Sequence, residues 1–281
     1  MSVRPANALV RGVSAVGALV RYPIERALDA VIYGGGLTRL LGSVLVRVGA
    51  VLIGRGGRRR LDALVRQMIR VGVRSIPIVV LVQTFIGVIL ALNMAPTLEA
   101  YGQLERVADV VAIAMFRELG PLFTAILLSG FAGASIAAEL GAMVEGEEIK
   151  ALRAHALDPI RFLVVPRVVA TATMMVGLTV LADLVGLLGG YLCATLNLGL
   201  SGTLYIDATR AALSMSDYLT GLVKAAVFGV LIALLACHEG LSVRGGAEGV
   251  GRATTTTVVK SIVAIIIADV IFAVVFYSLG W

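Results

Sequence analysis

An arginine and a glutamate stand side by side at the head of a strongly apolar run, in the stretch FRELGPLFTAILLSG that covers residues 116–130. Charged side chains are costly in hydrocarbon, so Arg117 and Glu118 need a reason to be there. One reason is structural: the two side chains form an ion pair at the membrane interface that anchors the helix. The other is functional: they contact a charged ligand. The residues alone leave both interpretations open.

Three further charges fall within apolar stretches, namely Asp183, Lys224 and Asp269. Charges in such positions usually pair with one another or face a water-filled cavity. Asp183 and Lys224 lie in the middle or outer half of adjacent apolar segments, which favours an ion pair between them. A proton or ion pathway that uses these residues is the alternative.

The chain offers little other reactive chemistry. His155 and His238 are isolated, and no nucleophile lies in a recognisable arrangement with a base, so we expect no catalytic residue. Cys193 and Cys237 have no metal-ligand spacing and fall at opposite membrane faces, so we expect neither a metal site nor a disulfide. The GxxxxGK[ST] pattern of a phosphate-binding loop is absent, which places any ATP hydrolysis in another polypeptide.

Composition identifies the kind of protein that carries these residues. Of its 281 residues, 59% are hydrophobic and only 15% are charged, and the mean hydropathy is +0.97. Soluble domains are closer to a quarter charged. The chain is therefore expected to be an all-α integral membrane protein. The arginines near its N-terminus are interleaved with apolar residues at helical spacing, which argues against a nucleic-acid partner.

A helix needs about 20 apolar residues to cross the hydrocarbon core. Five segments meet this requirement and predict a five-span domain over 75–281: about 75–95, 112–138, 163–195, 218–238 and 260–281.

Residues 1–74 have a different character and are expected to be cytoplasmic or interfacial. They hold 13 of the 24 Lys and Arg residues, all of them arginine. Residues 58–74 place apolar side chains on one face and arginines on the other, which predicts an amphipathic helix in the membrane surface. Residues 37–54 carry Arg39 and Arg47 in an apolar stretch, and a sixth span there is the alternative.

Loop charges predict the orientation. The loops at 139–162 and 239–259 carry five Lys or Arg residues, whereas the opposite loops at 96–111 and 196–217 carry only Arg106 and Arg210. Positive residues favour the cytoplasmic side. The N-terminus is therefore expected in the cytoplasm and the C-terminus in the periplasm.

The first of the basic loops, in VEGEEIKALRAHALDPIRFLVVPR, predicts a short helix over about 145–157. Its start carries acidic residues and its end basic ones, an order that suits the helix dipole. Asp158-Pro159 is expected to end the helix. Such a helix is either a solvated turn or a docking element for a soluble motor. The charged residues concerned are Glu145, Glu147, Glu148, Lys150 and Arg153.

The second basic loop is rich in glycine. Gly245, Gly246, Gly249 and Gly251 predict a flexible turn, and the threonines at 254–257 are expected to cap the last span.

Three motifs together resemble the MlaE/YrbE permease family. They are RELGPLFTAILLSGFAGASIAAELGAM, then EIKAL followed by LDPIRFLVVPRVVA, then GAEGVGRATTTTVVKS, in the order in which the family carries them. The resemblance covers the second span through the start of the fifth.

This resemblance implies a function and a set of partners. Permeases of this family are membrane subunits of ABC transporters that move phospholipids or related lipids across the bacterial envelope. A homodimer of permeases, each with an N-terminal elbow helix and five spans, lies in the inner membrane. Two cytoplasmic ATPase subunits bind the ATP and Mg, so no cofactor is expected in this chain. An MlaD-like Mce-domain protein receives or delivers lipid on the periplasmic side, and some systems add a STAS-domain protein.

The resemblance also implies roles for residues. Arg117 would neutralise a lipid phosphate, and Glu118 would pair with Arg117 or with a lipid amine. Asn93 matches a polar position in the same cavity, although asparagine is not the commonest residue there. The 145–157 helix would be the coupling helix that enters a groove on the ATPase.

Two rival functions remain. A stand-alone, ion-coupled secondary transporter would use Asp183 and Asp269 as proton sites. A membrane enzyme acting on lipid would need an acid–base or metal arrangement, which the sequence does not offer.

Overall fold

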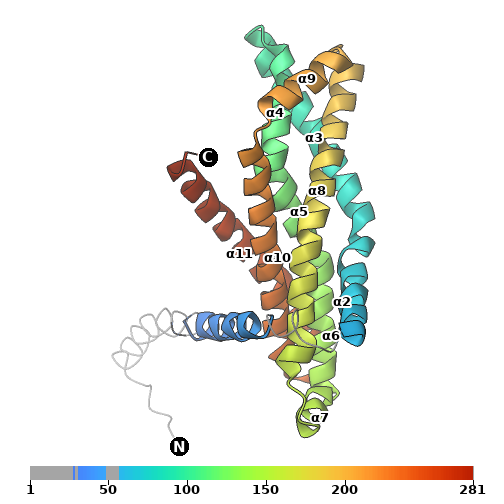
Figure 1. The fold of residues 1–281 in the computed structure, drawn as a ribbon, viewed down its shortest axis with the longest axis vertical. Coiled ribbons are helices and arrows are strands. Elements are labelled where there is room, and N and C mark those ends of the chain that lie inside the picture. The colour runs from blue at the N-terminus through green and yellow to red at the C-terminus, as the bar shows by residue number, and fades with distance from the viewer. Residues whose placement is uncertain (1–27, 29–30, 49–56, 281) are drawn as a thin grey trace, which may run out of the picture. The chain divides into compact units, whose positions relative to one another are not determined.

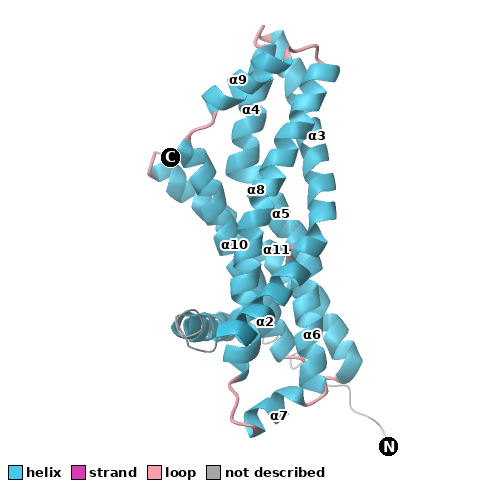
Figure 2. Cartoon of the chain, turned by 45° about the vertical axis from the view of Figure 1, so that its right-hand side comes forward, coloured by secondary structure: helices cyan, strands magenta, loops and turns pink. Residues whose placement is uncertain are grey.

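The structure is a computed structural model that describes residue 28 and residues 31–48 and 57–280. Contacts divide the chain into two units, Met1–Ser43 and Val44–Trp281. Helices, helical turns and short loops make up all of the described part, which contains no strand (Figure 2). The all-α prediction is confirmed. Half of the expected N-terminal interfacial region, including residues 49–54, lies outside the described residues.

The helices of the second unit follow one another with short connections (Figure 1). The α-helices are α2 Gly57–Val71, α3 Ile76–Ala100, α4 Val107–Ala114, α5 Gly120–Leu128, α6 Ala134–Glu145, α7 Glu148–Ala154, α8 Val165–Leu196, α9 Gly202–Ala212, α10 Met215–Leu241 and α11 Gly246–Ser278. Two short 3₁₀ turns, η1 Val73–Ser75 and η2 Leu104–Arg106, join α2 to α3 and lead into α4. Three π-helical turns are η3 Met115–Leu119, η4 Ser129–Gly133 and η5 Ile160–Val164.

Six helical segments are long and apolar enough to cross a membrane: Val31–Val48, Leu64–Ala100, Leu104–Glu145, Ile160–Leu196, Met215–Leu241 and Gly246–Ser278. Five of them coincide with the five predicted spans, and the last ends at Ser278, short of the predicted 281. The remaining segment, Val31–Val48, overlaps the 37–54 stretch, for which a further span is the alternative prediction. An amphipathic helix is present at the predicted place as α2, and it packs against α8. The segment that contains the first span begins within this helix, at Leu64, and not at 75 as predicted.

Several helices begin earlier in the sequence than predicted. The second span was expected to begin near 112, but its helix begins at Leu104 and runs through two π-turns to Glu145. The last helix begins at Gly246 rather than near 260, so Gly249 and Gly251 are helical and do not form a flexible turn. The predicted threonine cap is also wrong, because residues 254–257 lie inside α11 and its N-cap is Gly245.

Glycine allows two of the long helices to touch. A Cβ on Gly87 of α3 would lie 1.9 Å from the carbonyl oxygen of Gly186 on α8. Small residues at such contacts let backbones approach closely, which is how helices associate in lipid. The α3–α8 pair thereby forms a rigid support for the helices that carry the charged residues.

Burial differs strongly between the last two helices. In its most apolar window α10 is 61% buried, whereas α11 is only 11% buried. Within the second unit, α10 is therefore the central helix, and α11 presents most of its surface outward. The short helices α7 and α9 lie at opposite ends of this unit (Figure 1).

Candidate functional site

Arg117 and Glu118 lie in the π-turn η3, in the middle of a continuous helical segment and not at its head. The cause is local. Pro121 has no N–H, so the carbonyl of Arg117 lacks its usual donor four residues later. The chain adopts the wider turn instead, and the N–H of Gly120 bonds to the carbonyl of Met115. Such π-turns occur frequently at functional sites.

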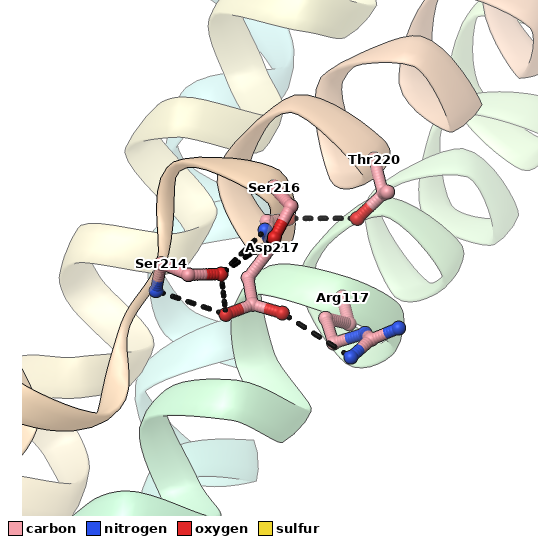
Figure 3. Close-up of polar contacts among 5 residues, drawn as sticks. All are labelled: Arg117, Ser214, Ser216, Asp217 and Thr220. Atoms are coloured by element: carbon pink, nitrogen blue, oxygen red, sulfur yellow. Dashed lines mark hydrogen bonds and ion pairs between the residues drawn. The ribbon is translucent and has the colours of Figure 1, made fainter. Parts of the chain in front are cut away.

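Arg117 reaches the start of α10. Its guanidinium Nη1 lies 3.2 Å from Oδ1 of Asp217 (Figure 3). The other oxygen of Asp217 accepts hydrogen bonds from the backbone N–H of Ser214 at 2.9 Å and from its hydroxyl at 2.6 Å. Ser214 in turn accepts from the N–H of Asp217, which completes a capping box. The cap therefore holds the carboxylate rigidly in front of Arg117.

Glu118 reaches a different partner. Its Oε2 lies 2.6 Å from the ammonium of Lys224 on α10, and Oδ1 of Asp269 on α11 lies 3.0 Å from the same nitrogen. Lys224 is only 1% exposed, whereas the side chain of Glu118 is 42% exposed. A single buried ammonium therefore joins η3, α10 and α11.

Glycine makes this arrangement possible. A Cβ on Gly221, one turn before Lys224, would lie 2.1 Å from the carbonyl oxygen of Phe116 in η3. Only glycine lets α10 approach the π-turn this closely.

These residues, which we call the charged cluster, are Arg117, Glu118, Asp217, Lys224 and Asp269. Part of it opens into a cleft of about 230 Å³. The cleft is lined by Arg117, Glu118, Thr220, Lys224, Ala273, Phe276 and Tyr277. Two cations and three carboxylates give the cluster a formal charge of −1. An apolar wall beside paired charges suits a ligand that carries both a charged group and hydrocarbon.

The predicted pair of Asp183 and Lys224 is wrong, because Lys224 pairs with Glu118 and Asp269. Asp183 faces a different neighbour: a Cβ on Gly120 would lie 1.8 Å from its Oδ1. That oxygen is buried and has no hydrogen-bond partner among the described residues. Both charges fall at similar depth in the sequence pattern, but that pattern does not show which neighbours each side chain faces.

Asn93 does not line the cleft. Its amide donates to the carbonyl of Ile89 one turn earlier in α3, at 2.8 Å, and the side chain is exposed. The structure therefore brings together Arg117, Glu118, Lys224 and Asp269, and leaves Asn93 and Asp183 outside that group.

The predicted helix at 145–157 is shorter than expected, spanning Glu148–Ala154 as α7. Glu145 ends α6 instead, and Glu147 occupies the connecting turn with a φ of 59°. The helix ends before Asp158-Pro159 because Ala156 turns left-handed, with a φ of 55°. The N–H of Leu157 then bonds to the carbonyl of Leu152, and that of Ala156 bonds to Arg153.

The charges of α7 remain at its surface. Lys150 lies 2.6 Å from Glu147, and both side chains are exposed. The hydrogen bond from Lys150 holds the pKa of Glu147 below its ordinary value.

Among the charged groups that sequence reasoning missed, two are instructive. Asp217 had a recognisable signal, since SMSD before an apolar run has the Ser-x-x-acid spacing of a capping box. The second group joins three helices: Glu139 of α6 lies 2.6 Å from Arg70 of α2 and 3.1 Å from Arg167 of α8. No local pattern connects residues so far apart in the sequence.

A metal centre has no support from the geometry. Across residues 31–48 and 57–280, no group of three or more His, Cys, Asp or Glu side chains lies close enough to hold a metal ion.

Most of this chain is similar in sequence to known membrane permeases. The family model described as Permease MlaE matches residues 64–275. A probable ABC transporter permease protein of Rickettsia felis is 37% identical over 218 residues, which cover 78% of this chain and 84% of the relative. The intermembrane phospholipid transport system permease protein MlaE of Haemophilus influenzae is 32% identical over 244 residues, or 86% of this chain and 94% of the relative. The chloroplastic protein TRIGALACTOSYLDIACYLGLYCEROL 1 of Arabidopsis thaliana is 34% identical over 213 residues, or 76% and 61% of the two chains.

Proposed function

The chain belongs to the MlaE permease family, and we propose that it is the membrane subunit of an ABC transporter that moves phospholipids across the bacterial envelope. In this proposal lipid passes between the inner membrane and an Mce-domain protein in the periplasm. A separate ATPase binds ATP and Mg and drives the transfer.

The observation that carries the proposal is the charged cluster beside an apolar cleft. A guanidinium is well suited to a phosphate group, because it offers several N–H donors in one plane. In the structure Arg117 is held by Asp217, so a lipid phosphate must compete with that carboxylate. The surplus carboxylate of the cluster matches an ammonium. The cleft thus favours a zwitterionic headgroup that contacts Arg117 with its phosphate and Glu118 with its amine.

The charged cluster also connects the cleft to the helices whose positions would change during transport. Lys224 joins η3, α10 and α11, so a shift of any of these elements changes the partners of Glu118. We infer that the ATPase docks on α7, whose exposed charges include Glu148, Lys150 and Arg153. ATP-driven closure of the motor would then shift the population of cleft conformations through α6.

A second copy of the chain would complete the transporter. The outward face of α11 is continuous and apolar, and it adjoins the cleft through Ala273, Phe276 and Tyr277. A homodimer with five spans in each copy would cover this face and enclose lipid between the copies. The α7 end would lie in the cytoplasm, with a STAS-domain protein bound to the ATPase in some systems.

The test is purification of the tagged protein in mild detergent, followed by mass spectrometry of the co-purified proteins and lipids. The wild type should retain an ATPase, an Mce-domain protein and phospholipid. Arg117→Ala should keep both proteins and lose most of the phospholipid, and Arg117→Lys should retain an intermediate amount.

Arg210→Ala is the matched control, because Arg210 is an exposed arginine of α9 that does not line the cleft. It should retain lipid as the wild type does. A folded protein that emerges alone and lipid-free would instead favour an ion-coupled secondary transporter. Arg117 and Glu118 would then be a structural anchor only.

A further inference from the structure

A second cleft lies elsewhere on the same helical segment, between α2 and the turn η4. Its volume is about 210 Å³. It is lined by Arg70, Val71, Arg74, Phe131, Ala132, Ser135 and Ile136, and it shares no residue with the cleft at the charged cluster. Phe131 lies 14 positions after Arg117, which corresponds to about 20 Å along a helix. The two clefts are therefore distinct sites at different depths.

Positive charge dominates the second cleft. Arg70 and Arg74 both line it, and Arg167 lies behind Arg70 on the shared carboxylate. Among the described residues, the ion pairs in this region involve one carboxylate, Glu139, which Arg70 and Arg167 already hold at 2.6 and 3.1 Å. Arg74 is exposed and makes no ion pair with any described residue. The cleft thus presents a guanidinium whose donors are available to an anion.

The opposite wall of the cleft is apolar. Phe131 is 43% exposed, and Ala132 and Ile136 lie beneath it in the buried part of the segment. Phe131 is in the π-turn η4, where the chain departs from regular α geometry. A large aromatic side chain beside a free guanidinium suits a ligand with both a phosphate and a hydrocarbon part. A soluble anion would gain nothing from that wall.

Position along the chain adds a further argument. Arg74 lies in the turn η1, between the amphipathic helix α2 and the apolar helix α3. Both helices contribute to the segment Leu64–Ala100, whose 37 residues exceed the roughly 20 that cross the hydrocarbon core. The excess length lets the end of this segment that carries Arg70 and Arg74 reach the level of the phosphates of a bilayer leaflet, and the cleft opens there.

We propose that this cleft binds the phosphate group of a membrane phospholipid, with Arg74 and Arg70 on the phosphate and Phe131 along the adjoining hydrocarbon. The site is separate from the one proposed for lipid transfer and does not depend on it. Its occupant is a resident lipid that fixes α2 against the η4–α6 segment.

The experiment is native mass spectrometry of the purified full-length protein, titrated with dioleoylphosphatidylglycerol in detergent. Arg74→Ala should weaken binding of this lipid about tenfold, because a charge-assisted contact to phosphate is lost. Ser135→Phe, which fills the cleft without changing charge, should weaken it similarly. Arg66→Ala is the matched control, since Arg66 is an exposed arginine of α2 that makes no ion pair with a described residue and lies outside the cleft.

Each outcome decides the matter. Retention of lipid by Arg66→Ala and loss by the two cleft variants would support the site. Equal losses in Arg66→Ala and Arg74→Ala would reduce the effect to general attraction between arginines and anionic lipid, and would overturn it. Displacement of the lipid by millimolar inorganic phosphate would identify a free phosphate site instead. Arg117→Ala should remove only the lipid held at the charged cluster and leave the Arg74-dependent lipid bound. Failure of the second site can therefore be distinguished from failure of the transfer site.

Discussion

Lys224 is the residue on which the charged cluster depends. It is 1% exposed and its ammonium lies within 3.0 Å of a carboxylate on each of two other elements, η3 and α11. An ion buried to this degree is tolerated only because its partners surround it. The same arrangement makes both carboxylates dependent on a single nitrogen.

Lys224→Met should therefore destabilise the protein by about 3–5 kcal/mol, because Glu118 and Asp269 lose their common partner. The measurement is the unfolding midpoint of the purified protein in detergent. A triple variant that adds Glu118→Gln and Asp269→Asn should recover much of the loss, since no unpaired charge then remains. If the triple variant were as unstable as Lys224→Met, packing rather than charge would explain the effect.

Lys150→Met is the matched control for this change. Lys150 also lies 2.6 Å from a carboxylate, but its side chain is 75% exposed. Exposed ion pairs contribute little to stability. The unfolding midpoint should hardly move.

Sequence predicted part of this chemistry. It identified Arg117, Glu118, Lys224 and Asp269, because charges in apolar runs are conspicuous. It paired them wrongly, because pairing depends on how far each helix is rotated about its axis. Pro121 and the π-turn that it causes change that rotation at Arg117 by adding a residue to one turn, which a regular helical repeat does not anticipate.

At the scale of elements, the contact between η3 and α10 rests on a glycine. Gly221→Ala should push α10 away from Phe116, since the Cβ would lie 2.1 Å from a backbone oxygen that cannot rotate aside. We expect a loss of about 1–3 kcal/mol in stability. Retained phospholipid should also fall, because Thr220 and Lys224 of α10 line the cleft and would move away from Arg117 and Glu118. Both are measured on the purified variant.

Gly177→Ala provides the comparison in α8, where a Cβ would meet nothing within 4 Å. It should leave lipid retention unchanged and raise stability slightly, because alanine favours helix over glycine. Equal effects of the two substitutions would contradict the close contact between Gly221 and the backbone of Phe116.

The helix α7 ends in a Schellman motif with an unusual residue. Ala156 occupies the left-handed position that glycine normally fills. Ala156→Gly should stabilise the end of α7 by about 1 kcal/mol, because the Cβ strain is removed. Hydrogen exchange of the α7 amides measures the gain. Ala151→Gly, in the interior of the same helix, should instead speed exchange, and matching behaviour of the two variants would refute the assignment.

Helices and spans were largely predictable, and their ends were not. Long apolar runs and the amphipathic pattern of α2 are properties of local sequence. The early end of α7 depends on a left-handed alanine, and the early start of α11 at Gly246 places glycines inside a helix. Both features oppose the conformational preferences of the residues concerned, so tertiary packing must determine where these two helices end and begin.

At the scale of the whole molecule, the unequal burial of α10 and α11 predicts a second copy. The large exposed hydrophobic residues of α11 are Val259, Val263, Ile266, Ile267, Val270, Ile271, Val274, Val275 and Tyr277. Val270→Cys, in a background where Cys193 and Cys237 are replaced by alanine, should form a disulfide-linked dimer in membranes on mild oxidation. Gel electrophoresis without reductant detects it.

Leu188→Cys is the matched control on α8. Leu188 is 52% exposed, close to the 58% of Val270, but it lies on a different helix. It should remain monomeric on the gel. Cross-linking of Leu188→Cys alone would place the contact between copies on α8 and not on α11.

The count of charges in the cluster has a consequence for the electrical behaviour of the protein. A group of two cations and three carboxylates within the bilayer lies inside the transmembrane potential. Moving one elementary charge across that potential changes the free energy by about 2.3 kcal/mol per 100 mV. A zwitterionic lipid adds no net charge, so its passage does no electrical work. A displacement of the cluster itself would do electrical work, because the cluster carries a net charge. The resting voltage of the cell would then favour one conformation of the cleft even with no lipid bound.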